Sequence, residues 1–134
     1  MFFRCLSQHL DFTEATQAGC KTFSEIAPSF LNFINETKLV AHNAKFDIGF
    51  VNAELEKTPY NNLRKSQCNA VDTVKVAQKV FPELGCYKLQ ELAKHFNIKV
   101  DAAHRAYDDA RVCMELFVLC MKKAASKIGI SVLF

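Results

Sequence analysis

The strongest constraint on the fold is an abrupt change of periodicity between residues 38 and 47. Lys38 to Ala41 is a short apolar run of the kind that forms a buried strand. The run ends at His42 and Asn43, both polar. Apolar residues then recur at helical spacing, at Ala44, Ile48, Val51 and Leu55. A strand that turns straight into a helix through polar residues is where open α/β sheets place their sites.

The rest of the chain predicts more helices and one further strand. Thr22 and Glu25 have the spacing of a capping box, which favours a helix start, and Pro28 either kinks that helix or begins it. We expect helices at 22–35, 44–57, 74–81, 88–96 and 105–123, and strands at 38–41 and 70–73. This order predicts an α/β fold with few strands.

The last of these helices should bury one apolar face. We expect its inward residues to be Ala106, Ala110, Cys113, Leu116, Phe117 and Cys120. Asp108 on the same helix is expected to be a solvated acid of the first turn.

Composition predicts a single packed domain. Half of the 134 residues are hydrophobic, enough to bury a core without disulfides. The six cysteines show neither C-x-x-C pairs nor zinc spacing, which favours a reducing, cytoplasmic environment. We expect no signal peptide and no membrane span, and the net charge of +3 is compatible with a nucleic-acid partner. We expect residues 1–21 to be irregular and 22–134 to form the domain.

A second polar cluster, His104 to Asp109, opens the last predicted helix. Asp47 and Asp109 would then both lie in first helical turns, and each alone is explained as a helix-start acid. Together they are the hard oxygen ligands that Mg²⁺ takes, leaving positions for water and phosphate oxygens. A nearby histidine such as His104, with an ordinary pKa of about 6.5, can accept a proton from an attacking water.

Four stretches in this order resemble a known family. They are H-N-A-x-F-D at 42–47, V-D-T at 71–73, K-L-x-x-L-A at 88–93 and H-x-A-x-x-D at 104–109. The first and last resemble the second and third motifs of the DnaQ-like (DEDDh) 3′–5′ exonucleases, a family that includes the epsilon proofreading subunits of bacterial DNA polymerase III. The resemblance covers residues 22–123.

The resemblance implies a ribonuclease H-like α/β fold and hydrolysis at the 3′ end of single-stranded DNA. Two Mg²⁺ or Mn²⁺ ions about 3.5–4 Å apart would support the reaction. It also implies that DNA polymerase III subunits are possible partners, in the context of replication proofreading.

The same resemblance assigns roles to individual residues. Asp47 and Asp109 would be metal ligands, and His104 would be the general base. The wall that holds the terminal nucleotide would be formed by His42, Asn43 and Phe46. Phe46 is equally compatible with a place in the core, and Asp72 is expected to make local hydrogen bonds after its strand.

The sequence departs from the family at the first motif. That motif, D-x-E, does not occur in this sequence, so two of the family's four carboxylates are missing. We therefore expect an N-terminally incomplete fold that lacks the first strands and leaves an exposed edge beside Leu39 and Val40. With only two carboxylates for two divalent ions, we expect a weak or inactive exonuclease, as in a truncated or degenerate copy.

Two other functions stay open. The alternatives are an RNA-directed exonuclease and a non-catalytic module that binds nucleic acid or a polymerase subunit. Lys45, Lys88, Arg105 and Arg111 suit phosphate contacts but are also ordinary helix-surface charges. We expect residues 126–134 to be too short to serve as a polymerase-docking tail.

Overall fold

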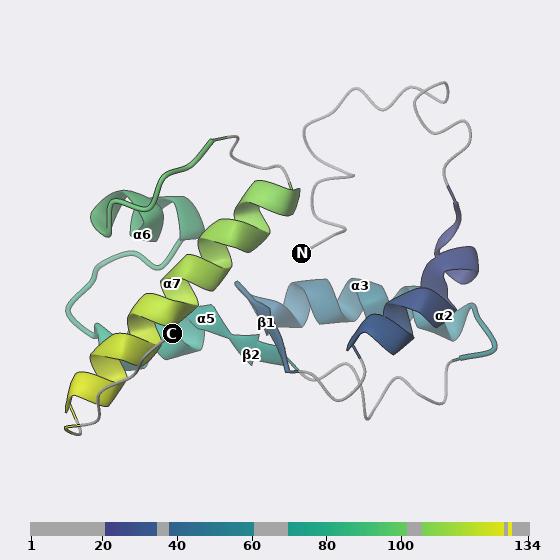
Figure 1. Ribbon diagram of the computed structural model, residues 1–134, viewed down its shortest axis with the longest axis horizontal. Helices are drawn as coiled ribbons and strands as arrows, with labels where there is room; N and C mark the ends of the chain where they lie inside the picture. The colour runs from purple at the N-terminus through teal and green to yellow at the C-terminus, as the bar shows by residue number, and fades with distance from the viewer. Residues whose placement is uncertain (1–20, 35–37, 61–69, 102–105, 128, 130–134) are drawn as a thin grey trace.

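A computed structural model describes residues 21–34, 38–60, 70–101, 106–127 and 129 (Figure 1). Its elements are, in order, α2 (Phe23–Ile34), β1 (Leu39–Ala41), α3 (Ala44–Glu56), β2 (Ala70–Asp72), α5 (Thr73–Val80), α6 (Leu89–His95) and α7 (Ala106–Lys127). The predicted order of helices and strands is confirmed, and α7 runs past the predicted end at residue 123. Among these described helices none is long and apolar enough to cross a membrane.

The two strands pair in parallel. Leu39 lies opposite Ala70, Val40 opposite Val71, and Ala41 opposite Asp72. Helix α3 makes the crossover that parallel strands require. Because the carboxyl ends of both strands meet at one edge, the polar residues that follow them become neighbours. The backbone N–H of Asn43 donates a hydrogen bond of 3.1 Å to Oδ1 of Asp72.

Asp72 also begins the next helix. As the N-cap of α5, it accepts a hydrogen bond of 3.0 Å at Oδ1 from the backbone N–H of Val74. The local hydrogen bonding predicted for Asp72 is therefore confirmed. One carboxylate oxygen serves both α5 and the junction between β1 and α3.

Helices cover the sheet on both faces, and β1 separates two apolar clusters. Leu39 packs against the cluster of α2 and α3, whereas Val40 packs against that of α5, α6 and α7. Figure 1 shows these two groups of helices on opposite sides of the strands. The smaller cluster contains Ala27, Leu31, Ile34, Val51 and Leu55. The larger one contains Ala77, Val80, Leu89, Leu92, Ala93, Ile98, Val112, Cys113, Leu116 and Cys120.

The capping interaction predicted at Thr22 and Glu25 is present. Oε2 of Glu25 accepts hydrogen bonds of 2.7 Å from both the backbone N–H and the hydroxyl of Thr22. These hydrogen bonds lower the pKa of Glu25. Helix α2 begins at Phe23 and runs through Pro28, so it does not begin at the proline.

The buried face of α7 matches the prediction only in part, and two of the predicted residues, Ala106 and Phe117, are half-buried. Cys113, Leu116 and Cys120 are buried as expected, but Ala110 is exposed and Val112 is buried instead. Asp108 lies on the buried face of α7 and is only 5% exposed. Ala110 comes two residues later, about 200° around the helix, and therefore points to the opposite side. The prediction that Asp108 is solvated is wrong.

Asp108 is buried against Asp101 and Arg111. Its Oδ2 accepts a 3.0 Å hydrogen bond from the backbone N–H of Asp101, and its Oδ1 lies 2.6 Å from Nη2 of Arg111. Arg111 also contacts Glu115 and the carbonyl oxygen of Lys99, each at 2.6 Å. The hydrogen bonds that Arg111 donates to Asp108 and, second, to Glu115 raise the pKa of Arg111. The guanidinium group of Arg111 is therefore paired with carboxylates of the protein itself.

The packing of α7 predicts unequal costs for two neighbouring truncations. Leu116 is fully buried, so Leu116→Ala should lower the free energy of unfolding by about 2–5 kcal/mol through lost burial and a cavity. Met114, two residues away, is 57% exposed, and Met114→Ala should change it by less than about 0.5 kcal/mol. Urea unfolding followed by circular dichroism measures both, and equal losses would contradict this packing.

Two cysteines should differ in reactivity for a related reason. Burial is the main cause that raises the pKa of the Cys113 thiol, and a raised pKa disfavours the reactive thiolate. Cys86 is exposed. At about pH 8, near the ordinary thiol pKa, N-ethylmaleimide should label Cys86 rapidly and Cys113 only after unfolding. Peptide mass spectrometry distinguishes the two sites, and labelling at equal rates in the native protein would rule out a buried Cys113.

Candidate active site

The junction between β1 and α3 sends two adjacent side chains in opposite directions. Asn43 has φ 64° and ψ 53°, a left-handed conformation that asparagine adopts more readily than most residues. His42, just before it, is buried at 5% exposure, whereas Asn43 is exposed. The turn then brings Asp47, also 5% exposed, into the first turn of α3.

His42 joins three parts of the fold through its ring. Nε2 lies 2.8 Å from the carbonyl oxygen of Tyr87, and Nδ1 lies 2.8 Å from the hydroxyl of Thr73. A carbonyl only accepts, so Nε2 must be the donor to Tyr87. His42 thus links the end of β1 to the start of α5 and to the segment before α6. Its predicted role in substrate binding stays a prediction.

The charge of Asp47 is felt on α7 at Cys113. Besides burial, the charge of the Asp47 carboxylate raises the pKa of the Cys113 thiol, although a hydrogen bond to Thr73 opposes the rise. Cys113 lies one helical turn after Asp109, on the same side of α7. The buried carboxylate of Asp47 on α3 is therefore within electrostatic range of Cys113 on α7.

Asp109 is held by the helix next to it. Its Oδ1 accepts a hydrogen bond of 3.1 Å from the side-chain amide of Gln90, in the first turn of α6. Tyr87, which binds His42, lies three residues before Gln90. The short segment 87–90 consequently contacts both halves of the predicted site, His42 beside α3 and Asp109 on α7.

The carboxylates of Asp47 and Asp109 fit a hard divalent cation. Their oxygens are the ligands that Mg²⁺ or Mn²⁺ accepts, with water and phosphate oxygens completing the shell. Within the described ranges, no three side chains of His, Cys, Asp or Glu gather as a metal site. The described part of the chain therefore supplies at most two ligands, and His104 lies outside it.

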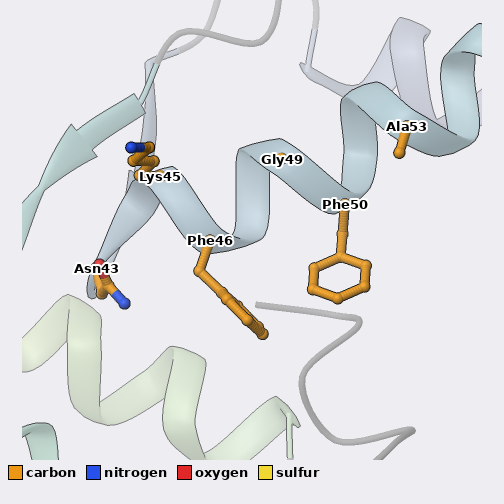
Figure 2. Close-up of a pocket in the computed structure, with 6 residues that line it drawn as sticks. All are labelled: Asn43, Lys45, Phe46, Gly49, Phe50 and Ala53. Carbon is orange, nitrogen blue, oxygen red and sulfur yellow. The ribbon is translucent and has the colours of Figure 1, made fainter.

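An open pocket lies along α3 (Figure 2). Its volume is about 510 Å³, and it is lined by Asn43, Lys45, Phe46, Gly49, Phe50 and Ala53. Phe46 and Phe50 point to the same side of the helix in Figure 2, and their rings meet edge to face at 4.8 Å. They are 39% and 44% exposed, so Phe46 is not a core residue.

Phe50 and Gln90 were not predicted as site residues. A signal for Phe50 was available, since it follows Phe46 by four residues and lies off the apolar stripe of its helix. Gln90 had no such signal, because it occupies a variable position of K-L-x-x-L-A and becomes relevant only through its contact with Asp109.

The family model described as Exonuclease matches residues 7–117. The match begins inside the segment 1–21 that we expected to be irregular. It includes all four stretches on which the resemblance was based, and it confirms both the α/β ribonuclease H-like class and the exonuclease resemblance.

Curated relatives support the same assignment. The DNA polymerase III subunit epsilon of Treponema pallidum (strain Nichols) is 50% identical over 112 residues, covering 80% of this chain and 49% of that protein. The epsilon subunit of Aquifex aeolicus (strain VF5) is 34% identical over 118 residues, covering 88% and 57%. The PolC-type DNA polymerase III of Clostridium perfringens (strain 13 / Type A) is 34% identical over 126 residues, covering 93% and 8%.

The chain thus spans about half the length of these epsilon subunits and a small part of the PolC-type polymerase. With a family match over most of its residues and this identity to epsilon subunits, the chain belongs to the exonuclease family.

Proposed function

We propose that this chain is a 3′–5′ exonuclease domain that removes nucleotides from the 3′ end of single-stranded DNA. One observation carries the proposal beyond family membership. The segment 87–90 binds His42 at the start of α3 and Asp109 on α7, and thereby keeps the two acid-bearing helices in register. The relatives named as polymerase III epsilon subunits favour a role in proofreading.

In this proposal Asp47 and Asp109 hold a divalent cation, Mg²⁺ or Mn²⁺, between α3 and α7. When bound, the cation supplies Lewis-acid activation of the scissile phosphate and of the attacking water. The burial of Asp47 places its charge where solvent screens it little, which strengthens its hold on a cation. His104 takes the proton of the attacking water, since a histidine is partly unprotonated at neutral pH.

The exposed pocket along α3 would receive the terminal nucleotides. Asn43 offers an amide to sugar or base, and the faces of Phe46 and Phe50 offer stacking surfaces to unpaired bases. His42 would act indirectly, because the hydrogen bonds of its ring would fix the turn that exposes Asn43. Stacking on aromatic rings tolerates any base, which suits an enzyme that must remove whichever nucleotide was misincorporated.

The missing D-x-E motif sets a limit on this activity. Two Mg²⁺ ions carry four positive charges, and Asp47 with Asp109 returns only two negative ones. We therefore propose that the 134-residue chain binds its cations weakly and hydrolyses DNA slowly, if the sequence supplies no other ligand. The same observation favours the second candidate, a non-catalytic module of this fold that binds nucleic acid or a polymerase subunit.

The partners follow from the relatives. Proteins named as DNA polymerase III subunits act within a replication complex, so we propose association with that polymerase in the cytoplasm. RNA stays an alternative substrate, because the carboxylates and the stacking faces do not distinguish the sugars.

A digestion assay tests the proposal. With Mn²⁺ and a 5′-labelled single-stranded DNA, the chain should produce a ladder that shortens from the 3′ end. Asp47→Asn and Asp109→Asn should abolish the ladder because each removes a charged ligand, and His104→Ala should slow it by about 10²–10⁴-fold. A matched RNA oligonucleotide tests the alternative substrate.

The control is Glu83→Gln, an exposed acid away from the proposed site, which should leave the rate unchanged. Binding of the oligonucleotide without cleavage, and unaffected by Asp109→Asn, would identify the non-catalytic module. Cleavage that survives both aspartate substitutions would overturn the assignment of the metal ligands.

A further inference from the structure

The contact between Gln90 and Asp109 differs in kind from the exposed ion pairs within single helices. Lys57 with Glu54, and Lys94 with Glu91, are exposed pairs three residues apart within one helix. Gln90 and Asp109 are 19 residues apart, on different helices, and their hydrogen bond is partly buried. Such a contact fixes the orientation of a side chain relative to the fold.

The chemistry of this contact suits a metal ligand. Nε2 of Gln90 donates to Oδ1 of Asp109, which leaves Oδ2 and the second lone pair of Oδ1 for other partners. Since an ionised carboxylate only accepts, the amide must present its NH₂ group, so its orientation is settled. An uncharged donor orients the carboxylate and leaves its negative charge to the cation. A lysine or arginine at this position would compete with the cation for that charge.

The backbone of Gln90 is held from both sides. Just before it, the carbonyl of Tyr87 accepts the hydrogen bond from His42, and the hydroxyl of Tyr87 donates to the carbonyl of Phe81 at 2.7 Å. Just after it, Leu92 is buried in the core that α6 shares with α7. The backbone of Gln90 is therefore held in place, and its side-chain amide reaches Asp109 from this position.

We propose that Gln90 is a positioning residue for Asp109, and that the segment from Tyr87 to Gln90 is the bridge that sets Asp109 in register with the start of α3. This inference rests on the proposed function, because it concerns the cation that Asp109 would hold. It predicts that loss of the amide weakens cation binding while the fold stays intact.

Direct binding of Mn²⁺ to the full chain tests the inference without relying on turnover. The free-ion signal in electron paramagnetic resonance gives the dissociation constant of Mn²⁺ for each variant. Gln90→Met keeps the length of the side chain and removes the donor, so the dissociation constant should rise about tenfold, the loss expected when an outer hydrogen-bond partner of a ligand is removed. Gln90→Ala should give the same rise.

The matched control is Gln78→Met, an exposed glutamine on α5, which should change neither Mn²⁺ binding nor the melting temperature. A purely structural role for Gln90 would instead lower the melting temperature and leave the dissociation constant unchanged. Should Gln90→Met lower the melting temperature, Gln90→Ala, which favours the helix, carries the test.

Three results separate the inference from the proposed function. Weaker Mn²⁺ binding in both Gln90 variants, with wild-type binding in Gln78→Met, supports the inference. Unchanged binding in the Gln90 variants, together with a loss in Asp109→Asn, overturns the inference and leaves the proposed function standing. Equal binding by wild type and Asp109→Asn, or no binding by either, means that Asp109 is no ligand and overturns both.

Discussion

The parallel pairing of β1 with β2 is the constraint on which the rest of the structure depends. Parallel strands end at the same edge of a sheet, so the residues that leave β1 must meet those that leave β2. The hydrogen bonds of Asn43 to Asp72 and of His42 to Thr73 are the direct result. A shift of one residue in this register would turn Leu39 and Val40 to the wrong faces and separate these polar groups.

Two of the polar residues at this edge, His42 and Thr73, are buried, and their burial is tolerated because they satisfy each other. Thr73 is fully buried, yet its hydroxyl lies 2.8 Å from the ring of His42 and 3.3 Å from the carbonyl of Ala41. An unsatisfied buried donor or acceptor costs about 1–3 kcal/mol of stability, so removing one partner would leave the other with that cost. Such a network fixes the strand ends more tightly than two strands of three residues could alone.

Much of the fold could be predicted because its signals are local. The helical spacing from Ala44 to Leu55, the capping pair at Thr22 and Glu25, and the polar break after β1 all act within a few residues, and the structure confirms each. The start of α7 could not be predicted in this way. Asp108 is buried there by its contacts with Asp101 and Arg111, which the periodicity of the sequence does not reveal.

The candidate site likewise contains residues that the sequence predicts and residues that only the structure reveals. Asp47 and Asp109 could be proposed from motifs whose spacing places them in first helical turns. Phe50 and Gln90 matter only through contacts between side chains, Phe50 with Phe46 and Gln90 with Asp109. The role of His104 stays a prediction, since it lies outside the described residues. The two aspartates therefore carry a signal in the sequence, whereas the contacts of Phe50 and Gln90 become visible only in three dimensions.

The central claim is that the first turns of α3 and α7 share one cation. Its most direct test is paramagnetic broadening in a ¹⁵N–¹H correlation spectrum of the uniformly labelled chain, titrated with Mn²⁺ below one equivalent. A shared ion predicts that the amide signals of Asp47 and Asp109 broaden together, at the same Mn²⁺ concentration, while those of exposed acids elsewhere, such as Glu83, stay sharp. Broadening of only one of the two aspartates, or of neither, would contradict the claim.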